Sequence, residues 1–402
     1  MNPDAQRLWR GPRWTLAALL ACLGTLGPFS IDTYLPAFAG IAAAIGATPV
    51  EMQQTLSSYL LGFAVMNLLH GALADSFGRR PVVLCGLAVF TLASAGCALA
   101  GTTGELVAFR ALQGVSAGAG VVVSRAIIRD LFAPADAQRV MSQVTIFFGL
   151  APAIAPLVGG FLFVHVGWRA VFWFLAAVGA ALWFVNWRRL PETLHASAAQ
   201  PFDLRSLFAA YWRMVRSARV MALVLASGVP FNGMFLYVLA APVFLGGHLQ
   251  LPPQHFYWMF LCTITGIMGG AWTSGRLAGR VTRRRQVRHG LAVMGAVSVV
   301  NVALNLLFVP SAWWALPPIG VFSFGWALTM PVVTLMLLDL VPERRGMVAS
   351  VQASIGSFAN ALVAGALTPL VMHSTVALAF ASSGMMAIGL AAWLWVRRRL
   401  PD

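Results

Sequence analysis

Residues 71–81 read Gly-Ala-Leu-Ala-Asp-Ser-Phe-Gly-Arg-Arg-Pro, a short polar turn in an otherwise apolar part of the chain. Apolar runs lie on either side of it, at 52–75 and 80–100. An α-helix needs about 20 such residues to cross the hydrocarbon core of a bilayer. Strands of a membrane barrel would alternate polar and apolar residues, and these runs do not. The stretch therefore predicts two membrane-spanning helices joined by a tight turn.

The whole chain is too apolar for a soluble domain. Of its 402 residues, 59% are hydrophobic and 10% are charged, whereas soluble domains carry about 45–50% apolar and about 25% charged residues. We predict an all-α membrane protein with twelve transmembrane helices in two pseudo-symmetric six-helix bundles. The predicted spans are residues 14–38, 52–75, 80–100, 104–129, 138–164, 169–187, 219–245, 255–278, 287–308, 312–340, 345–371 and 374–396.

The charge balance is strongly basic, and the positions of the arginines decide what it means. The 27 basic residues are all arginine and stand against 12 acidic residues, which gives a formal net charge of +15. Such a charge could indicate a nucleic-acid partner. However, all arginines except Arg110, Arg125 and Arg169 flank the spans on one side, as the positive-inside rule describes for a cytoplasmic face. We therefore predict no nucleic-acid partner and place both termini in the cytoplasm.

The sequence lacks the patterns typical of enzymes and of metal proteins. The four cysteines lie far apart, without the Cys/His spacing of a metal site. No Walker loop or HExxH pattern occurs. We expect no enzymatic activity, no metal and no cofactor, so an ion gradient is the natural energy source.

A weak internal repeat relates the two halves of the chain. Residues 71–74 return 204 positions later as 275–278, and the Arg-Arg pair at 79–80 returns at the same offset as 283–284. Two similar six-span halves are typical of transporters whose binding site lies between the halves.

The longest loop separates these halves. The sequence Arg-Arg-Leu-Pro closes both of them, at 188–191 and at 398–401. Within 202–217, apolar residues at helical spacing alternate with arginines, which predicts an amphipathic helix on the inner membrane surface. Such a helix could couple the halves or, in the reading we favour, bind the linker to anionic lipid. The predicted domains are an N-terminal bundle at 1–190, a cytoplasmic linker at 191–218 and a C-terminal bundle at 219–402.

Three motifs resemble those of one transporter family. Segment 71–81 is similar to the signature loop GxLxDxxGRRP of the major facilitator superfamily, and 110–114 resembles its RxxQG motif. Residues 149–160 resemble the motif of its drug–proton antiporters, with Ala155 where a glycine is usual. In the second half, Gly279 stands where a repeated loop could have had an acid like Asp75.

Within the superfamily, residues 30–36 and 125–131 look like the Bcr/CflA group of multidrug exporters. The resemblance implies a proton-coupled secondary transporter that exports drugs or other amphiphilic small molecules across a bacterial inner membrane by alternating access. Its partners would be protons, a small-molecule substrate and membrane lipid, and the protein would be a monomer. One alternative is a dedicated exporter or importer of a single metabolite, such as a sugar or a siderophore. Another is a structural or sensing membrane protein without transport.

Two charged residues inside predicted spans are the candidates for proton coupling. Asp32 lies between Pro28 and Pro36 in an otherwise uncharged span, and intramembrane acids usually mark functional sites. Burial favours the neutral carboxyl, so Asp32 could hold and release a proton. Arg110 in the fourth span needs a partner or a wet cavity, and the family resemblance suggests a part in coupling. The alternatives are a buried ion pair or a position at a water-exposed end for Asp32, and an inert salt bridge for Arg110.

The candidates for a conformational switch are helix-bending prolines, small residues and inner-face charges. Gly71 and Gly78 are expected to allow close helix approach and a tight turn. Asp75 is expected to accept hydrogen bonds from the N-terminus of a facing helix, and the arginines are expected to pair with Asp130. The full set is Gly71, Asp75, Gly78, Arg79, Arg80, Asp130, Pro152, Pro156, Gly159 and Gly160.

The candidates for substrate binding are polar and aromatic residues within spans, because drug-binding cavities are mainly apolar with a few placed polar groups. They are Tyr34, Tyr59, Gln113, Gln143, Asn232, Phe235, Trp326 and Phe358.

Overall fold

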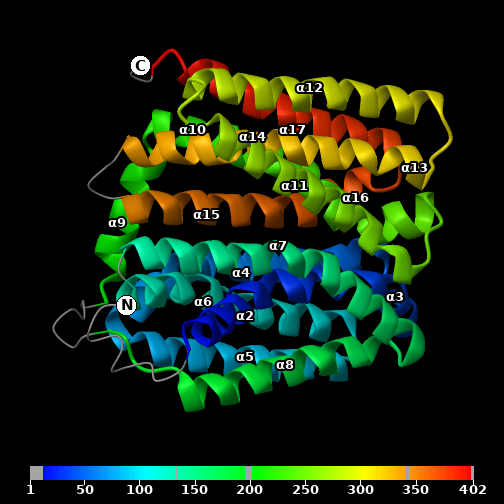
Figure 1. Cartoon of the computed structure of the whole chain (residues 1–402). Coiled ribbons are helices and arrows are strands. Elements are labelled where there is room, and N and C mark those ends of the chain that lie inside the picture. Colours follow the sequence, from blue (N-terminus) through cyan, green and yellow to red (C-terminus); the bar gives the residue numbers. More distant parts are fainter. Residues whose placement is uncertain (1–11, 133, 195–201, 341–344, 400–402) are drawn as a thin grey trace. The chain divides into compact units, whose positions relative to one another are not determined.

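The computed structural model describes residues 12–132, 134–194, 202–340 and 345–399, and all regular secondary structure in these ranges is helical (Figure 1). The chain forms two compact units, Met1–Asp203 and Leu204–Asp402. The division falls inside the segment that the sequence predicts as a linker.

The first unit comprises α2 (Arg13–Asp32), η1 (Leu35–Ala37), α3 (Phe38–Ile45), α4 (Pro49–Phe77), α5 (Arg79–Leu99), α6 (Thr103–Leu131), α7 (Pro134–His165) and α8 (Trp168–Arg189). The second comprises α9 (Leu204–Val215), α10 (Ala218–Leu239), η3 (Pro242–His248), η4 (Pro253–His255), α11 (Tyr257–Leu277), α12 (Arg283–Leu307), α13 (Ala312–Ala315), α14 (Pro317–Asp339), α15 (Arg345–Leu362), η6 (Val363–Leu367), α16 (Thr368–Val371) and α17 (Thr375–Val396).

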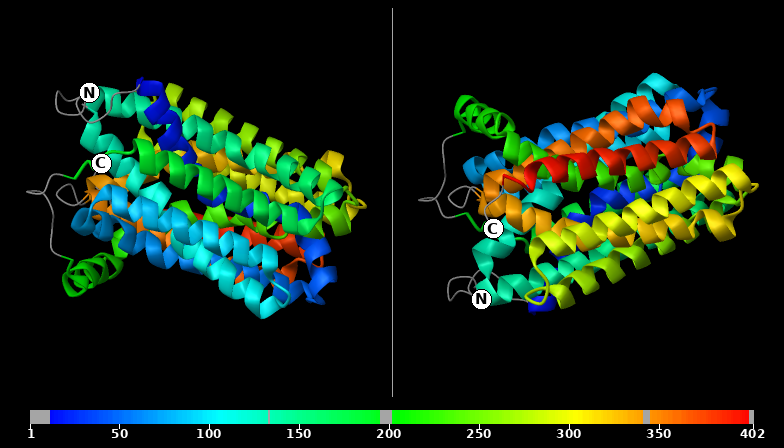
Figure 2. Two further views of the ribbon diagram at one scale, coloured as in Figure 1. Left: turned by 90° about the horizontal axis from the view of Figure 1, so that it is seen from below. Right: turned by 90° about the horizontal axis from the view of Figure 1, so that it is seen from above.

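The order of long helices matches the order of predicted spans. Ten helical segments of the described residues are long and apolar enough to cross a membrane. The fifth and eighth places belong to α7, whose described apolar part is Ala151–His165, and to α11, which is 21 residues long. In both views of Figure 2 the long helices of each unit lie side by side. The prediction of an all-α fold with twelve membrane-spanning helices is confirmed.

The internal repeat of the sequence is also a repeat of packing. In the first unit α4 packs on α6, α5 on α8 and α2 on α7. In the second unit the helices at the same places in the order pair likewise: α11 packs on α14, α12 on α17 and α10 on α15. These three pairings recur in both halves, whereas α10 packs extensively on α17 and its first-unit counterpart α2 hardly contacts α8.

Glycines permit the closest of these helix contacts. A Cβ atom on Gly114 of α6 would lie 1.9 Å from the carbonyl oxygen of Tyr59 in α4. In the second unit, a Cβ atom on Gly266 of α11 would lie 2.0 Å from the carbonyl oxygen of Gly320 in α14. Both distances are too short for any other residue, so these backbones touch only because no side chain intervenes.

Several spans are not continuous α-helices. The first span, predicted as one helix over 14–38, ends its α-helix at Asp32 and continues through η1, where Pro36 lies, into α3. The span that begins with α10 continues as the π-helix η3, which starts at Pro242, and α15 continues as the π-helix η6. Proline has no N–H to donate to the preceding turn, and π segments are frequent at functional sites.

Capping boxes begin two of the long helices of the first unit, α4 and α6. Thr48 accepts a hydrogen bond from the backbone N–H of Glu51, whose carboxylate accepts from the backbone N–H of Thr48. Thr102 and Glu105 repeat the arrangement at the start of α6. Each box satisfies backbone donors that a helix leaves unpaired, so it fixes where α4 and α6 begin.

Candidate functional site

Asp32 is the last residue of α2, at the break in the first span. Its side chain is 5% exposed. In the described part of the chain it makes no hydrogen bond and no ion pair, so the alternative of a buried ion pair is wrong for this structure. A buried carboxyl without a partner is costly to ionise. Gain or loss of a proton by Asp32 would therefore change the charge in the buried interior of the first unit.

Arg110 is fully buried, at 0% exposure, in α6. Its guanidinium lies over two aromatic rings, with its Cζ 4.7 Å from the ring centroid of Tyr34 and 4.3 Å from that of Tyr59. Nη1 donates to Oε1 of Gln113 in the next turn of the helix. Nε and Nη2 have no hydrogen-bond partner in the described residues. Its charge is thus stabilised by π faces and an amide, and the salt bridge that was the alternative for Arg110 is absent from the described part of the chain.

Tyr59 connects the surroundings of Arg110 with the end of α2. Its hydroxyl donates to the carbonyl oxygen of Gly27 at 2.9 Å and accepts from the hydroxyl of Ser30 at 2.9 Å. Tyr59 therefore links helix α2, which ends at Asp32, to the ring that covers the Arg110 guanidinium.

Two residues that the sequence analysis missed orient the cluster. The Thr55 hydroxyl pairs with the Tyr34 hydroxyl at 2.6 Å, and the Ser94 hydroxyl accepts from Nε2 of Gln113 at 2.8 Å. Serine and threonine in membrane helices commonly bond to their own backbone, as both residues also do here. Their sequence positions alone carried no signal that would distinguish them.

Helix α7 presses against the same end of α2. A Cβ atom on Gly159 would lie 1.9 Å from the carbonyl oxygen of Thr33, the residue after Asp32. Pro156 and Gly160 of the same helix are also buried, and Pro152 is half-buried. The antiporter-like motif of α7 therefore contacts the break in the first span directly.

At the expected inner face, Arg79 lies at the centre of a second charged cluster. It forms an ion pair with Asp75, and its Nε donates to Oδ2 of Asp130 at 3.1 Å. The expected pairing of this arginine with Asp130 is therefore present. Thr193 donates to the same Asp130 oxygen at 3.0 Å. This cluster ties together α4, α5, α6 and the segment after α8.

Glu192, and not Asp75, accepts hydrogen bonds from the N-terminus of helix α5. Its carboxylate accepts from the backbone N–H groups of Arg79 and Arg80, at 2.9 and 3.0 Å, at the start of α5. Asp75 instead uses its carboxylate on the Arg79 side chain, so the expectation for Asp75 is corrected. The Arg80 side chain donates to the carbonyl oxygen of Trp187 at 2.7 Å.

Of the two glycines in this turn, one is needed for its conformation. Gly78 has φ 102°, and a Cβ atom there would lie 2.6 Å from Oε2 of Glu192. A Cβ atom on Gly71 would lie 3.8 Å from Val122, which is ordinary van der Waals contact. The expectation that Gly71 permits close helix approach is therefore wrong.

Three substrate-binding candidates of the first unit are buried and do not line an exposed surface in this structure. Tyr34, Tyr59 and Gln113 are fully buried and enclose Arg110. The side chain of Gln143 lies outside the described residues.

The candidates of the second unit form a loose aromatic group. Phe231 lies between Phe235 and Trp326, with ring centroids 5.4 and 5.0 Å away. Asn232 is buried, and its Oδ1 has no partner in the described residues. Phe358 on α15 is 56% exposed.

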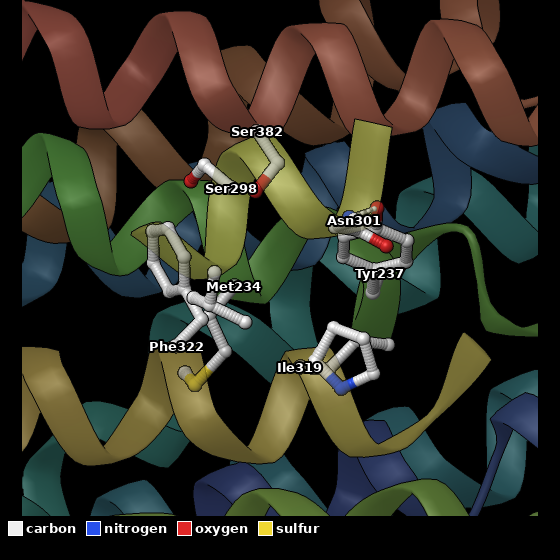
Figure 3. Close-up of a pocket in the computed structure, with 9 residues that line it drawn as sticks. Met234, Tyr237, Ser298, Asn301, Ile319, Phe322 and Ser382 are labelled. Atoms are coloured by element: carbon white, nitrogen blue, oxygen red, sulfur yellow. Dashed lines mark hydrogen bonds between the residues drawn. The ribbon is translucent and has the colours of Figure 1, made fainter. Parts of the chain in front are cut away.

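A small polar cavity lies inside the second unit (Figure 3). Its volume is about 10 Å³. Nδ2 of Asn301 donates to the Tyr237 hydroxyl at 2.8 Å, and the Ser298 hydroxyl has no partner there. Such a space holds about one water molecule, so this cavity is too small for a transported organic compound.

Comparison with known proteins places these motifs in a family. The model of the Major Facilitator Superfamily matches residues 20–364. The chain belongs to this superfamily. The superfamily comprises transporters, so this member is a multi-pass membrane transporter and not an enzyme.

Its relatives include proteins named for drug resistance. This superfamily member is 28% identical to the bicyclomycin resistance protein homolog of Haemophilus influenzae over 391 residues, 94% of this chain and 95% of that protein. It is 25% identical to multidrug resistance protein D of Escherichia coli over 393 residues, 96% of each chain. Among solved structures, the human organic anion transporter MFSD10 (TETRAN) matches 98% of this chain and 100% of its own, with a TM-score of 0.65 and 20% identity. The similarity to this human transporter concerns the fold alone.

Proposed function

We propose that this transporter exports drugs or other amphiphilic small molecules in exchange for protons, by alternating access. The names of its relatives support drug efflux. The observation that carries the proton coupling is Asp32, a buried carboxyl without a hydrogen-bond or ion-pair partner in the described residues, at the break of the first span.

In this proposal Asp32 holds the transported proton. A proton entering from outside neutralises the carboxyl, and release of that proton inside restores its charge. Because Gly159 of α7 touches the backbone of Thr33, a change at Asp32 can be passed to the packing of α2 against α7. The residues of the charged cluster at Arg79 act as the switch at the inner face.

Arg110 supplies a fixed positive charge buried within the same unit as this carboxyl. The π faces of Tyr34 and Tyr59 stabilise that charge without neutralising it. We assign these two tyrosines and Gln113 to the support of Arg110, and the group at Phe231, Phe235 and Trp326 to contact with apolar parts of the substrate.

We also propose the orientation and surroundings of the chain. Both termini face the cytoplasm, in agreement with the arginine distribution. Helix α9 of the 191–218 linker lies on the membrane surface, because its Phe208 and Trp212 are exposed and Arg216 stacks on Trp212. The membrane is the inner membrane of a bacterium, and the protein works as a monomer.

Asp32→Asn tests the mechanism. The amide is nearly isosteric but cannot carry a proton, so we expect proton-driven efflux from inverted membrane vesicles to fall at least about a hundredfold, in line with the loss of a required proton carrier. The matched control is Asp339→Asn, which removes a carboxylate from an exposed ion pair with Arg283. Near-normal efflux by well-expressed Asp32→Asn protein would refute the role of Asp32.

The range of substrates needs a separate measurement. Resistance of cells to several unrelated amphiphilic compounds, abolished by an uncoupler, is the expected result. Transport of a single sugar or siderophore instead would establish the dedicated transporter.

A further inference from the structure

The second unit contains a basic groove that the transport mechanism does not use. It lies where the start of α12 meets the end of α17, two helices that pack together (Figure 1). Its volume is about 450 Å³. The arginines and the tryptophan that line it are Arg284, Arg285, Arg288, Trp393, Arg397 and Arg398.

The groove has a cationic wall and an apolar floor. No acidic residue is among those that line it in the described part of the chain. Trp393 is 2% exposed and belongs to the packed face of α17. A cationic wall around an apolar base suits a molecule with an anionic head and an apolar body.

Four arginines of the groove differ from their neighbours in having no partner in the described part of the chain. Arg283 is paired with Asp339 at 2.8 Å, and Arg399 stacks on Trp395, with Cζ 3.8 Å from the ring centroid. In contrast, four groove arginines have no hydrogen bond, ion pair or aromatic ring among the described residues. They are Arg285, Arg288, Arg397 and Arg398. Clustered guanidinium groups repel one another unless an anion lies between them.

The first unit has a carboxylate at the equivalent junction of helices. Its equivalent junction, the start of α5 beside the end of α8, holds the carboxylate of Glu192, which accepts from the backbone N–H groups of Arg79 and Arg80. By the repeat of Arg-Arg-Leu-Pro, the sequence counterpart of Glu192 is Asp402, which lies outside the described residues. One half thus supplies its own anion to this junction.

We propose that the groove binds the headgroup of a phospholipid with two phosphodiester groups. A planar guanidinium donates two parallel hydrogen bonds to a phosphate, so four arginines from two chain segments can hold two phosphates. The apolar floor at Trp393 receives the adjoining glycerol and the first acyl carbons. The expected inner-face position brings the groove to the level of lipid phosphates.

Lipid binding to the full-length protein tests this proposal. The protein in detergent is titrated with cardiolipin, which has two phosphates, and separately with phosphatidylglycerol and phosphatidylcholine, and bound lipid is counted by native mass spectrometry. We expect cardiolipin to bind at least about tenfold more tightly than phosphatidylglycerol, because each added phosphate brings charge-assisted hydrogen bonds. Equal binding of all three lipids would overturn the proposal.

Matched double variants separate the groove from general positive charge. Arg288→Gln with Arg397→Gln removes two groove arginines and is expected to weaken cardiolipin binding roughly tenfold or more. The control, Arg276→Gln with Arg399→Gln, removes the same charge at the same expected face, from arginines stacked on Trp272 and Trp395. Equal loss in both variants would contradict a specific site.

Two further results would assign another occupant. Competition by millimolar inorganic pyrophosphate without any lipid retention would identify a free phosphate ligand instead of a lipid. Lipid retention that appears only in Asp402→Asn protein would show that the chain's own carboxylate fills the groove.

Discussion

Arg79 and Arg283 stand 204 residues apart at the same place in the repeat, yet they have different surroundings. Arg79 is almost buried and is shared between Asp75 and Asp130. Arg283 is 55% exposed and forms an ion pair with Asp339, which is 47% exposed. The position that matches Asp75 is Gly279. The fold therefore repeats while the charge network does not.

The difference shows how the two halves divide the work in our proposal. The first unit contains the buried Asp32 and Arg110 and the closed inner-face cluster. The second contains the aromatic group and, where α12 meets α17, the basic groove. In this proposal, the residues that couple transport to protons are concentrated in the first unit. The second unit has a similar helix order without these charged residues in its described part. Variants made at matched positions of the two halves test this division.

The largest expected difference is between two glycines of the matched helices α7 and α15. Gly159→Ala places a methyl group 1.9 Å from the carbonyl oxygen of Thr33, whereas a Cβ atom on Gly356 meets nothing within 4 Å. We expect Gly159→Ala to destabilise the protein by about 1–3 kcal/mol or more and to stop transport. Gly356→Ala should be neutral or stabilising by up to about 1 kcal/mol. Thermal unfolding in detergent measures both, and equal melting temperatures would contradict the close contact.

The next comparison removes the repeated arginines. Arg79→Gln leaves Asp75 and Asp130 close together without their shared cation, at a cost of about 1–3 kcal/mol. Arg283→Gln breaks an exposed pair, which contributes about 0–1 kcal/mol. We expect efflux to fall at least about tenfold in the first variant only. A tenfold change in rate corresponds to about 1.4 kcal/mol, which lies within the cost expected for Arg79→Gln. Similar efflux in the two variants would show that the inner-face clusters are equivalent.

The smallest expected effect belongs to Glu192→Gln. The amide keeps the shape and one acceptor oxygen but loses the charge that strengthens the bonds to the backbone of Arg79 and Arg80. We expect a loss of about 1 kcal/mol, seen as a small drop in melting temperature with efflux largely kept. The control is Glu51→Gln, which weakens a capping box at the other end of α4. A drop with Glu51→Gln alone would argue against the role of Glu192.

Sequence patterns predicted the parts of this protein that depend on composition and local motifs. The order of spans followed from apolar length, and the contact between Arg79 and Asp130 followed from charge at neighbouring helix ends. The break at Asp32 was not predicted, because a proline within a membrane span can either bend or end a helix. The choice depends on packing against α7.

Contacts between distant segments were beyond sequence reasoning. Glu192 accepts from residues more than a hundred positions earlier, and no local pattern marks such a bond. The same applies to Gly71 and Gly78, which look alike in the motif: only Gly78 has a positive φ and a neighbour that excludes a side chain. A motif names the residue types, whereas packing decides which of them are required.

The enclosure of Arg110 by two tyrosine rings has a consequence for how proton and drug would compete in the proposed antiport. Because aromatic faces carry no net charge, the buried charges of Asp32 and Arg110 add up to +1 when Asp32 is protonated and to zero when it is ionised. In a low-dielectric interior such a difference acts over distances well beyond contact. In the proposed antiport, a cationic drug is therefore disfavoured whenever the proton is bound, even if the two never touch the same atom. Proton-drug exchange in this proposal needs only local electroneutrality, so the proposed drug site is free to vary in shape.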